Sequence, residues 1–105
     1  MTDISLIYIT VKDAEEAQRI GHALLEGRFV ACVNIVEKII SDYWWEGKIV
    51  HDAEALVIAK TKKTLVPTVI EKVKSIHSYS CPCIVSLPVE AGNDDFFSWV
   101  RRETQ

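Results

Sequence analysis

The chain has 105 residues, 49% of them hydrophobic and 26% charged, a composition that predicts one folded domain over residues 1–105. The net charge of −3, the scattered basic residues and the lack of any apolar run near the ~20 residues that span a bilayer argue against nucleic-acid or membrane partners. Three cysteines, and a start that enters a strand pattern without a leader, favour a reducing compartment, so we expect a cytoplasmic protein.

The first predicted strand covers residues 4–11, where almost every side chain is apolar or aromatic. A strand that is apolar on both faces is typical of a sheet centre. A helix should follow, because Asp13 can cap its first turn with Glu16 at the capping-box position. Its buried face is predicted to comprise Ala17, Ile20, Gly21, Leu24 and Leu25. Gly27 stands where this helix should stop.

The stretch 29–62 predicts a β-hairpin that is too long for a domain of this size. An arm of about 17 residues would span roughly 55 Å, whereas a globule of this length has a radius of gyration of only ~13 Å, so the hairpin should project. Its turn is predicted at residues 46–48, where Gly47 can adopt a positive φ. Glu37 and Lys38 interrupt the outgoing arm and predict a bend or bulge.

Three aromatic side chains, Tyr43, Trp44 and Trp45, stand next to this predicted turn. On a projecting hairpin they would expose a large apolar surface to water unless another subunit covers it. We therefore predict that these three residues form an interface between subunits.

A second helix is predicted to begin at Thr64, since Pro67 is tolerated in a first turn. Its buried stripe is predicted to be Val66, Val69, Ile70, Val73 and Ile76. A last strand at residues 83–89 and a short helix at 94–102 complete the chain. In the last helix the candidates for burial are Phe96, Phe97, Trp99 and Val100.

The predicted order β-α-β-β-α-β corresponds to the ferredoxin-like fold, an α+β arrangement in which two helices cover one face of an antiparallel sheet. The other face would be uncovered, although its strands are not cleanly polar at alternate positions. Packing of one sheet on another in a closed three-fold ring of subunits would cover that face. We therefore expect a homotrimer.

Several motifs extend over essentially the whole chain. They are Ala31-Cys32-Val33-Asn34-Ile35, Ser41-x-Tyr43-Trp44-Trp45-Glu46-Gly47-Lys48-Ile49, Glu54, Lys60-Thr61, His77-x-Tyr79-x-x-Pro82, and Leu87-Pro88 before Gly92 and Trp99. Together they closely resemble the divalent-cation tolerance protein CutA family. The resemblance implies a ferredoxin-like fold, a very stable trimer similar to PII signalling proteins, and an association with tolerance to copper and other divalent cations.

The densest supply of thiol and imidazole donors is His77, Cys81 and Cys83, within seven residues, and soft or borderline metals need such donors. In copper-binding members of the family, ligands are proposed at a first-strand cysteine and at two adjacent histidines near the end of the second helix. Only His77 matches that set here, since Ile9 and Ile76 occupy the other positions. Cys81 and Cys83 can provide a local replacement, or they can simply be packing residues.

A second candidate site combines Cys32, Asn34 and Lys60, which can point from neighbouring strands into a shared polar site between subunits. Such a site would suit an anion or a small metabolite. The alternative is that Cys32 packs as a small apolar residue and that Asn34 satisfies backbone groups at an interface.

Other chemistry is weakly indicated. His51, Asp52 and Glu54 on the return arm are expected to form a solvated strand face, since His51 alternates away from Asp52. The sequence has no Ser-His-Asp order, glycine-rich phosphate loop or paired-carboxylate pattern, so we expect no enzymatic activity. Two functions remain: a non-enzymatic trimer that binds copper or another divalent cation, and a PII-like module that binds a small ligand or partner protein at clefts between subunits.

Overall fold

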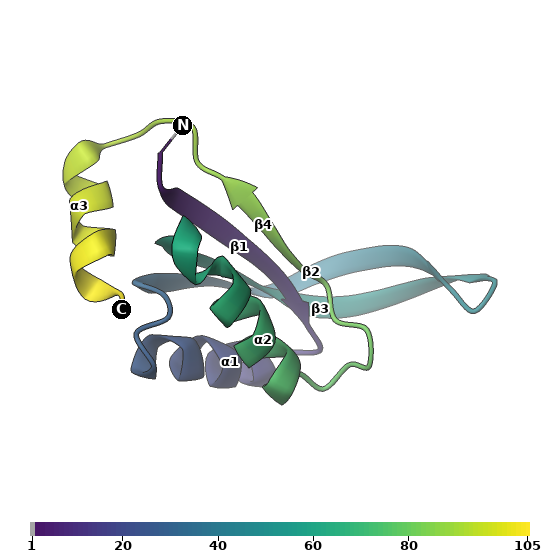
Figure 1. The fold of residues 1–105 in the computed structure, drawn as a ribbon. Coiled ribbons are helices and arrows are strands. Elements are labelled where there is room, and N and C mark those ends of the chain that lie inside the picture. The colour runs from purple at the N-terminus through teal and green to yellow at the C-terminus, as the bar shows by residue number, and fades with distance from the viewer. Residues whose placement is uncertain (1) are drawn as a thin grey trace.

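A four-stranded antiparallel sheet with helices on one face forms the body of the protein, and the computed structural model describes residues 2–105 (Figure 1). The elements are β1 (Ile4–Val11), α1 (Ala14–Glu26), β2 (Cys32–Trp45), β3 (Lys48–Lys62), α2 (Val66–Ile76), β4 (Ile84–Pro88) and α3 (Asp94–Glu103). The strands lie in the order β2-β3-β1-β4. This arrangement confirms the predicted α+β fold with its β-α-β-β-α-β order and short C-terminal helix.

The hydrophobic core lies between the sheet and helices α1 and α2. β1 is hydrogen-bonded to β3 on one side and to β4 on the other, which confirms its predicted place in the sheet centre. Its alternate side chains Ile7, Ile9 and Val11 are fully buried in this core. Burial of each isoleucine stabilises the fold by about 1.5–3 kcal/mol.

Helix α1 begins and ends where the sequence predicts. The Asp13 side chain accepts a hydrogen bond of 2.9 Å from the backbone N–H of Glu16 and so caps the first turn. The helix ends at Gly27, but the left-handed residue is Arg28, with a φ of 59°. A Cβ atom at Gly27 would come within 2.4 Å of the Phe29 ring, so this glycine is required for space rather than for a positive φ.

Several details differ from the sequence prediction. Helix α2 begins at Val66 rather than Thr64, because residues Lys63–Leu65 form a separate 3-10 turn. β4 is one residue shorter at each end than predicted. Leu25, which was predicted on the buried face of α1, is 38% exposed in the single chain. The buried stripe of α2 is confirmed at its centre, where Val69 and Val73 are fully buried.

Helix α3 lies at the end of the sheet that is farthest from the hairpin tip (Figure 1). Phe97 and Val100 are buried and form a second small cluster with Ile4 of β1. The helix therefore docks on its own chain. Phe96, a predicted candidate for burial, is instead exposed.

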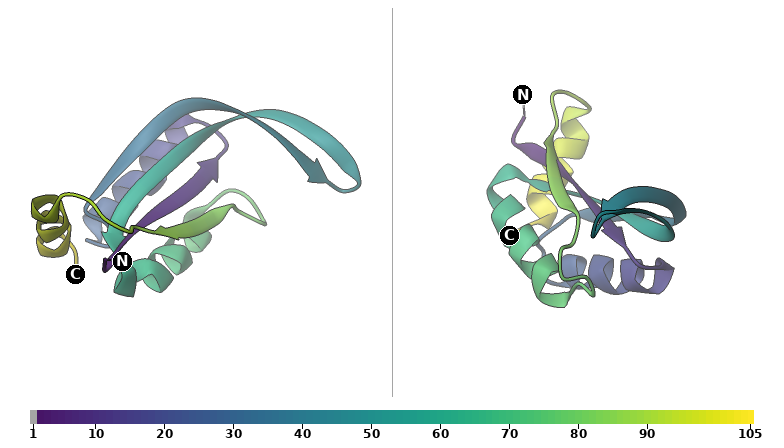
Figure 2. Two further views of the ribbon diagram at one scale, coloured as in Figure 1. Left: turned by 90° about the horizontal axis from the view of Figure 1, so that it is seen from above. Right: turned by 90° about the vertical axis from the view of Figure 1, so that its right-hand side faces the viewer.

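The β2–β3 hairpin projects beyond the helices, as predicted, and curves along its length (Figure 2). Because of this curvature the longest dimension of the chain is 44 Å, less than the length of a straight arm. Its tip is a two-residue turn in which Glu46 has a φ of 51° and Gly47 a φ of 79°, which confirms the predicted turn. The pairing skips between Val36 and Ile39, so the predicted bulge is also confirmed.

The bulge decides which side chains share a face. From Cys32 to Val36, even-numbered residues of β2 pair with even-numbered residues of β3. From Ile39 to Trp45, odd-numbered residues of β2 pair with even-numbered residues of β3. Directly paired residues lie on the same face of a sheet. Tyr43 and Trp45 therefore lie on the face opposite α1 and α2, which we call the open face, while Trp44 lies on the other side of the hairpin.

The open face is largely apolar, and within residues 2–105 no helix covers it. β1, β3 and β4 place Leu6, Tyr8, Ile58, Val85 and Leu87 on it, according to their pairing. Val85 and Leu87 are exposed in the single chain. The predicted trimer, which would cover this face, stays a prediction. Within residues 2–105 no helix is long and apolar enough to cross a membrane.

Candidate functional site

A cavity of about 520 Å³ opens on the open face where the hairpin leaves the rest of the sheet. Its walls come from β1, from both hairpin strands and from the loop at residues 77–83 between α2 and β4. The lining residues are Tyr8, Thr10, Ser41, Tyr43, Trp45, Asp52, Glu54, Tyr79, Ser80, Cys81 and Cys83. The bulge makes this convergence possible, because it turns the β2 residues of the wall toward the open face.

Two tyrosine–carboxylate pairs organise the polar wall of the cavity. The Tyr79 hydroxyl donates a hydrogen bond of 2.8 Å to Glu54 Oε2, and the Tyr43 hydroxyl donates one of 2.9 Å to Asp52 Oδ2. Burial, together with the bond to Glu54, raises the pKa of Tyr79, and the bond to Asp52 raises the pKa of Tyr43. Both phenols therefore remain protonated donors at neutral pH.

The expectation that the return arm has a solvated face is wrong for Glu54. This residue is only 7% exposed, because Tyr79 and the cavity wall cover it. His51 does alternate away, as predicted, and pairs with Asp42 on the other side of the hairpin. The sequence did contain a signal for this position. Glu54 lies two residues before Leu56 on the same strand, so both side chains lie on the open face.

His77 holds the 77–83 loop against β1. Its Nδ1 accepts a hydrogen bond of 3.0 Å from the Tyr79 backbone N–H, so the proton is assigned to Nε2, which lies 2.9 Å from the Thr10 carbonyl oxygen. Both ring nitrogens are thus occupied by backbone groups. The imidazole has no free lone pair with which to bind a metal ion in this arrangement.

Glu16 anchors the same loop from α1. Its carboxylate is almost fully buried and accepts hydrogen bonds from the backbone N–H groups of Ser78 and Lys12, each at 2.9 Å, and from Arg19 at 3.0 Å. Burial opposes ionisation, but the bonds from Lys12 and Ser78 outweigh it and lower the pKa of Glu16. The buried Glu16 and the half-buried His77 therefore fix the path of the loop that carries the cysteines.

The structure brings together only part of the predicted metal site. Cys81 and Cys83 are free, exposed and part of the cavity wall, whereas His77 is bonded to the backbone and does not line the cavity. Among the described residues, 2–105, no group of three or more His, Cys, Asp or Glu side chains is placed to hold a metal ion. Sequence reasoning missed that Asp52 and Glu54 face the same cavity as the two thiols.

The other predicted residues lie as follows. Lys60 Nζ donates to Asn34 Oδ1, and Cys32 is directly opposite Lys60, so these three do share the open face as expected. Their role in a pocket between subunits stays a prediction. Trp44 is 72% exposed and Trp45 48%, and Tyr43 is exposed as well. Their role at a subunit interface also stays a prediction.

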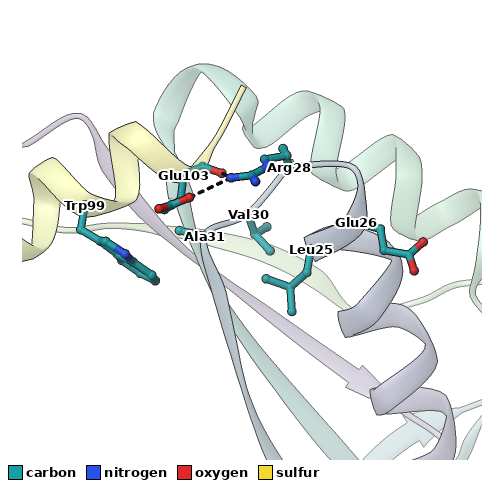
Figure 3. Close-up of a pocket in the computed structure, with 7 residues that line it drawn as sticks. All are labelled: Leu25, Glu26, Arg28, Val30, Ala31, Trp99 and Glu103. Atoms are coloured by element: carbon teal, nitrogen blue, oxygen red, sulfur yellow. Dashed lines mark hydrogen bonds and ion pairs between the residues drawn. The ribbon is translucent and has the colours of Figure 1, made fainter.

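A smaller cavity of about 310 Å³ lies between the end of α1 and α3 (Figure 3). Its cationic group, the Arg28 guanidinium, is already paired with Glu103 at 2.8 Å, and Trp99, also of α3, lies across from Leu25 of α1. Because Arg28 and Glu103 neutralise each other's charge in the smaller cavity, the larger cavity is the better candidate for a functional site.

Known proteins resemble this chain over nearly its whole length. A family model described as CutA1 divalent ion tolerance protein matches residues 5–103. The divalent-cation tolerance protein CutA of Archaeoglobus fulgidus is 45% identical over 96 residues, which cover 91% of this chain and 93% of that protein. A solved structure of the divalent cation tolerance protein Cut A1 of Thermus thermophilus matches with a TM-score of 0.94 and 41% identity, covering 97% of this chain and 99% of that one.

Relatives from plants and animals are longer. Protein CutA 1, chloroplastic, of rice is 39% identical over 100 residues, which cover 95% of this chain but 56% of the rice protein. The human and mouse proteins are matched over similar shares of their length. The chain thus spans little more than half the length of these relatives.

Proposed function

Because the chain belongs to the CutA1 divalent ion tolerance family, we propose that it is a non-enzymatic homotrimer that binds copper or another divalent cation in the cytoplasm. The observation that carries the proposal is the position of Cys81 and Cys83. Both thiols are free and exposed, and they border one cavity together with the carboxylates of Asp52 and Glu54.

The chemistry of these donors suits thiophilic ions. Thiolates select Cu(I) and Zn(II), and Cu(I) in particular is satisfied by few soft ligands. The carboxylates across the cavity add negative charge that favours the entry of a cation. His77 is left out of the proposed ligand set, because both of its ring nitrogens are engaged by the backbone.

The proposed trimer is supported by apolar surface that the single chain leaves uncovered. Trp44, Ile49 and Ile40 are exposed on one side of the hairpin, and Val85 and Leu87 are exposed on the open face. Contiguous apolar surface of this kind is typical of a protein interface. Exchange of projecting hairpins around a three-fold axis would bury both surfaces.

Native mass spectrometry of the reduced protein, titrated separately with Cu(I) and Zn(II), tests both parts of the proposal. We expect a trimer that takes up one ion per subunit and stops there. The variant with Cys81→Ser and Cys83→Ser should keep the trimer and lose the stoichiometric ion. Cys32→Ser is the matched control, since that thiol lies away from the cavity. Graded adducts that are unchanged in the double variant would reject the metal site.

A second candidate function is favoured by the cavity itself. Its volume, about 520 Å³, lies in the range of small-molecule binding sites. We propose as the alternative a PII-like module that binds a small ligand at this cavity, with metal uptake incidental. Metal uptake that survives loss of both thiols, together with stabilisation of the trimer by a small ligand, would favour this second function.

A further inference from the structure

We propose that Lys60 of one subunit forms ion pairs with the carboxylates of Asp52 and Glu54 of a neighbouring subunit, where the open faces of two copies pack on each other. The partner of this surface is thus a second copy of the chain. The inference rests on the assembly part of the proposed function and is independent of any metal or ligand. It names the groups that decide how two copies align, which apolar surface alone leaves open.

Charge is divided along the open face of β3. Asp52 and Glu54 stand at one end of this face and Lys60 at the other, with Leu56 and Ile58 between them, since alternate residues of a strand share a face. Glu54 and Lys60 are six positions apart in the strand. At ~3.3 Å per residue this separation is about 20 Å, so their side chains do not meet within one chain.

The acidic end can accept further hydrogen bonds. Tyr79 donates to Glu54 Oε2 at 2.8 Å and Tyr43 donates to Asp52 Oδ2 at 2.9 Å. An ionised carboxylate has about four acceptor positions, so one bond from a phenol leaves room for an ammonium group. Glu54 is only 7% exposed in the single chain, so pairing adds little to the cost of removing it from water. The cavity that both carboxylates line is the space that a lysine side chain would enter.

The basic end can donate further hydrogen bonds. Lys60 Nζ donates to Asn34 Oδ1, and an ammonium group has three N–H donors. The residues that pair with Lys60 on the neighbouring strands, Cys32 and Leu6, are not acidic. Lys62, the next residue of β3 on this face, adds a second positive charge. This end of the open face therefore attracts a negatively charged group from another molecule.

The apolar middle of the open face indicates that this other molecule is a second copy. Val85 and Leu87 of β4 are exposed there, and such surface is typical of a protein interface. If two open faces pack with like ends together, like charges oppose each other. If the acidic end of one copy meets the basic end of the next, opposite charges pair. Like charges that face each other across an interface are strongly unfavourable, so the charges select the second alignment.

Charge reversal tests the pairing, with sedimentation velocity of the full chain at low micromolar concentration as the measurement. Lys60→Glu and Asp52→Lys should each raise the dissociation constant of the assembly at least about tenfold. The double variant should recover most of this loss, because the pair forms again with its charges exchanged. Lys63→Glu in the 3-10 turn and Glu71→Lys on α2, both at exposed positions, are the matched controls and should assemble as the unmodified protein does.

Milder variants keep the test decisive if charge reversal disturbs folding. Lys60→Met and Glu54→Gln remove one charge each and preserve the size of the side chain. Raising NaCl from 0.05 M to 0.5 M should weaken assembly of the unmodified protein and weaken that of these variants less, because salt screens ion pairs. Reversed variants that assemble as tightly as the unmodified protein would overturn the inference. The same salt dependence in the unmodified protein and in both milder variants would also overturn it.

Mixing the two reversed single variants separates this inference from the proposed trimer. In a closed ring of three, a mixture restores at most two of the three contacts, whereas in a two-fold dimer it restores both. We therefore expect the mixture to recover less than the double variant does. Full recovery as a dimer would keep the ion pair and reject the trimer. An unmodified protein that stays monomeric at these concentrations would reject both.

Discussion

The two halves of the β2–β3 hairpin have similar apolar sequences and opposite surroundings. At the root, Val57 and Ala59 are fully buried under α1 and α2. In the arm beyond the bulge, Trp44 is 72% exposed and Ile49 67%. Apolar residues at the root therefore stabilise the fold of one chain, whereas those of the arm pair with each other across the hairpin and stay largely exposed. This difference supports the proposal that the arm contacts another subunit.

The comparison is tested most strongly by a matched pair of isoleucines. Ile9→Ala, in the core beside the root, should lower the free energy of unfolding by about 2–5 kcal/mol, because it leaves a cavity. Ile49→Ala, in the arm, should change the folding of the single chain by less than about 0.5 kcal/mol. Urea denaturation at several protein concentrations measures both effects. An equal, concentration-independent loss for both variants would contradict the distinction.

The next largest effect is expected on assembly. Trp44→Ala removes a large exposed aromatic from the arm, and such residues commonly contribute about 2 kcal/mol or more to an interface. The dissociation constant of the trimer should therefore rise at least about 30-fold, as measured by sedimentation velocity at low micromolar concentration. Leu25→Ala, an exposed apolar residue at the C-terminal end of α1 rather than in the arm, is the control. An intact trimer in the Trp44 variant would show that the arm is not the interface.

How far the sequence predicts these regions depends on the bulge. The bounds of β1 follow from its continuous apolar run, and Glu37 and Lys38 mark the bulge correctly. The sequence does not say how many residues the bulge adds, and one residue decides whether Trp44 or Trp45 lies on the open face. The fold could therefore be predicted and the orientation of the arm could not.

The candidate site was less predictable than the fold, because it combines elements that are distant in sequence. From the sequence, Glu54 is expected to be an exposed strand residue. In the structure Tyr79, 25 positions later in a loop, covers it. The role of His77 depends on which backbone groups reach its two ring nitrogens. Residue type identified the thiols as candidates, but only the packing shows that the imidazole is already occupied.

A smaller effect on stability is expected from the buried carboxylate at the root. Glu16→Gln weakens hydrogen bonds to three donors and should cost about 1–3 kcal/mol at neutral pH. The pKa of Glu16 is lowered in the folded state, so its contribution is present above 4.5 and is lost as the pH falls through the folded value. Urea denaturation between pH 7 and pH 3 should show a shallower decline in the variant.

The arm supplies the control for that measurement. The Glu37 side chain is exposed, so Glu37→Gln should change stability by less than about 0.5 kcal/mol at any pH. A pH profile of the Glu16 variant that coincides with the profile of the unmodified protein would mean that the buried carboxylate contributes nothing to acid sensitivity.

The smallest expected effect concerns the tip of the arm. Glu46 has a φ of 51°, a left-handed conformation that asparagine adopts more readily, and Asn-Gly is the preferred pair in such a turn. Glu46→Asn should therefore stabilise the protein by about 0.5 kcal/mol, whereas Gly47→Ala, with a φ of 79° and no neighbour within 4 Å, should cost about 1 kcal/mol through the backbone alone. Thermal unfolding at two protein concentrations measures both changes. A loss of trimer in Glu46→Asn would mean that another subunit binds this carboxylate, and the tip would then belong to the interface together with the rest of the arm.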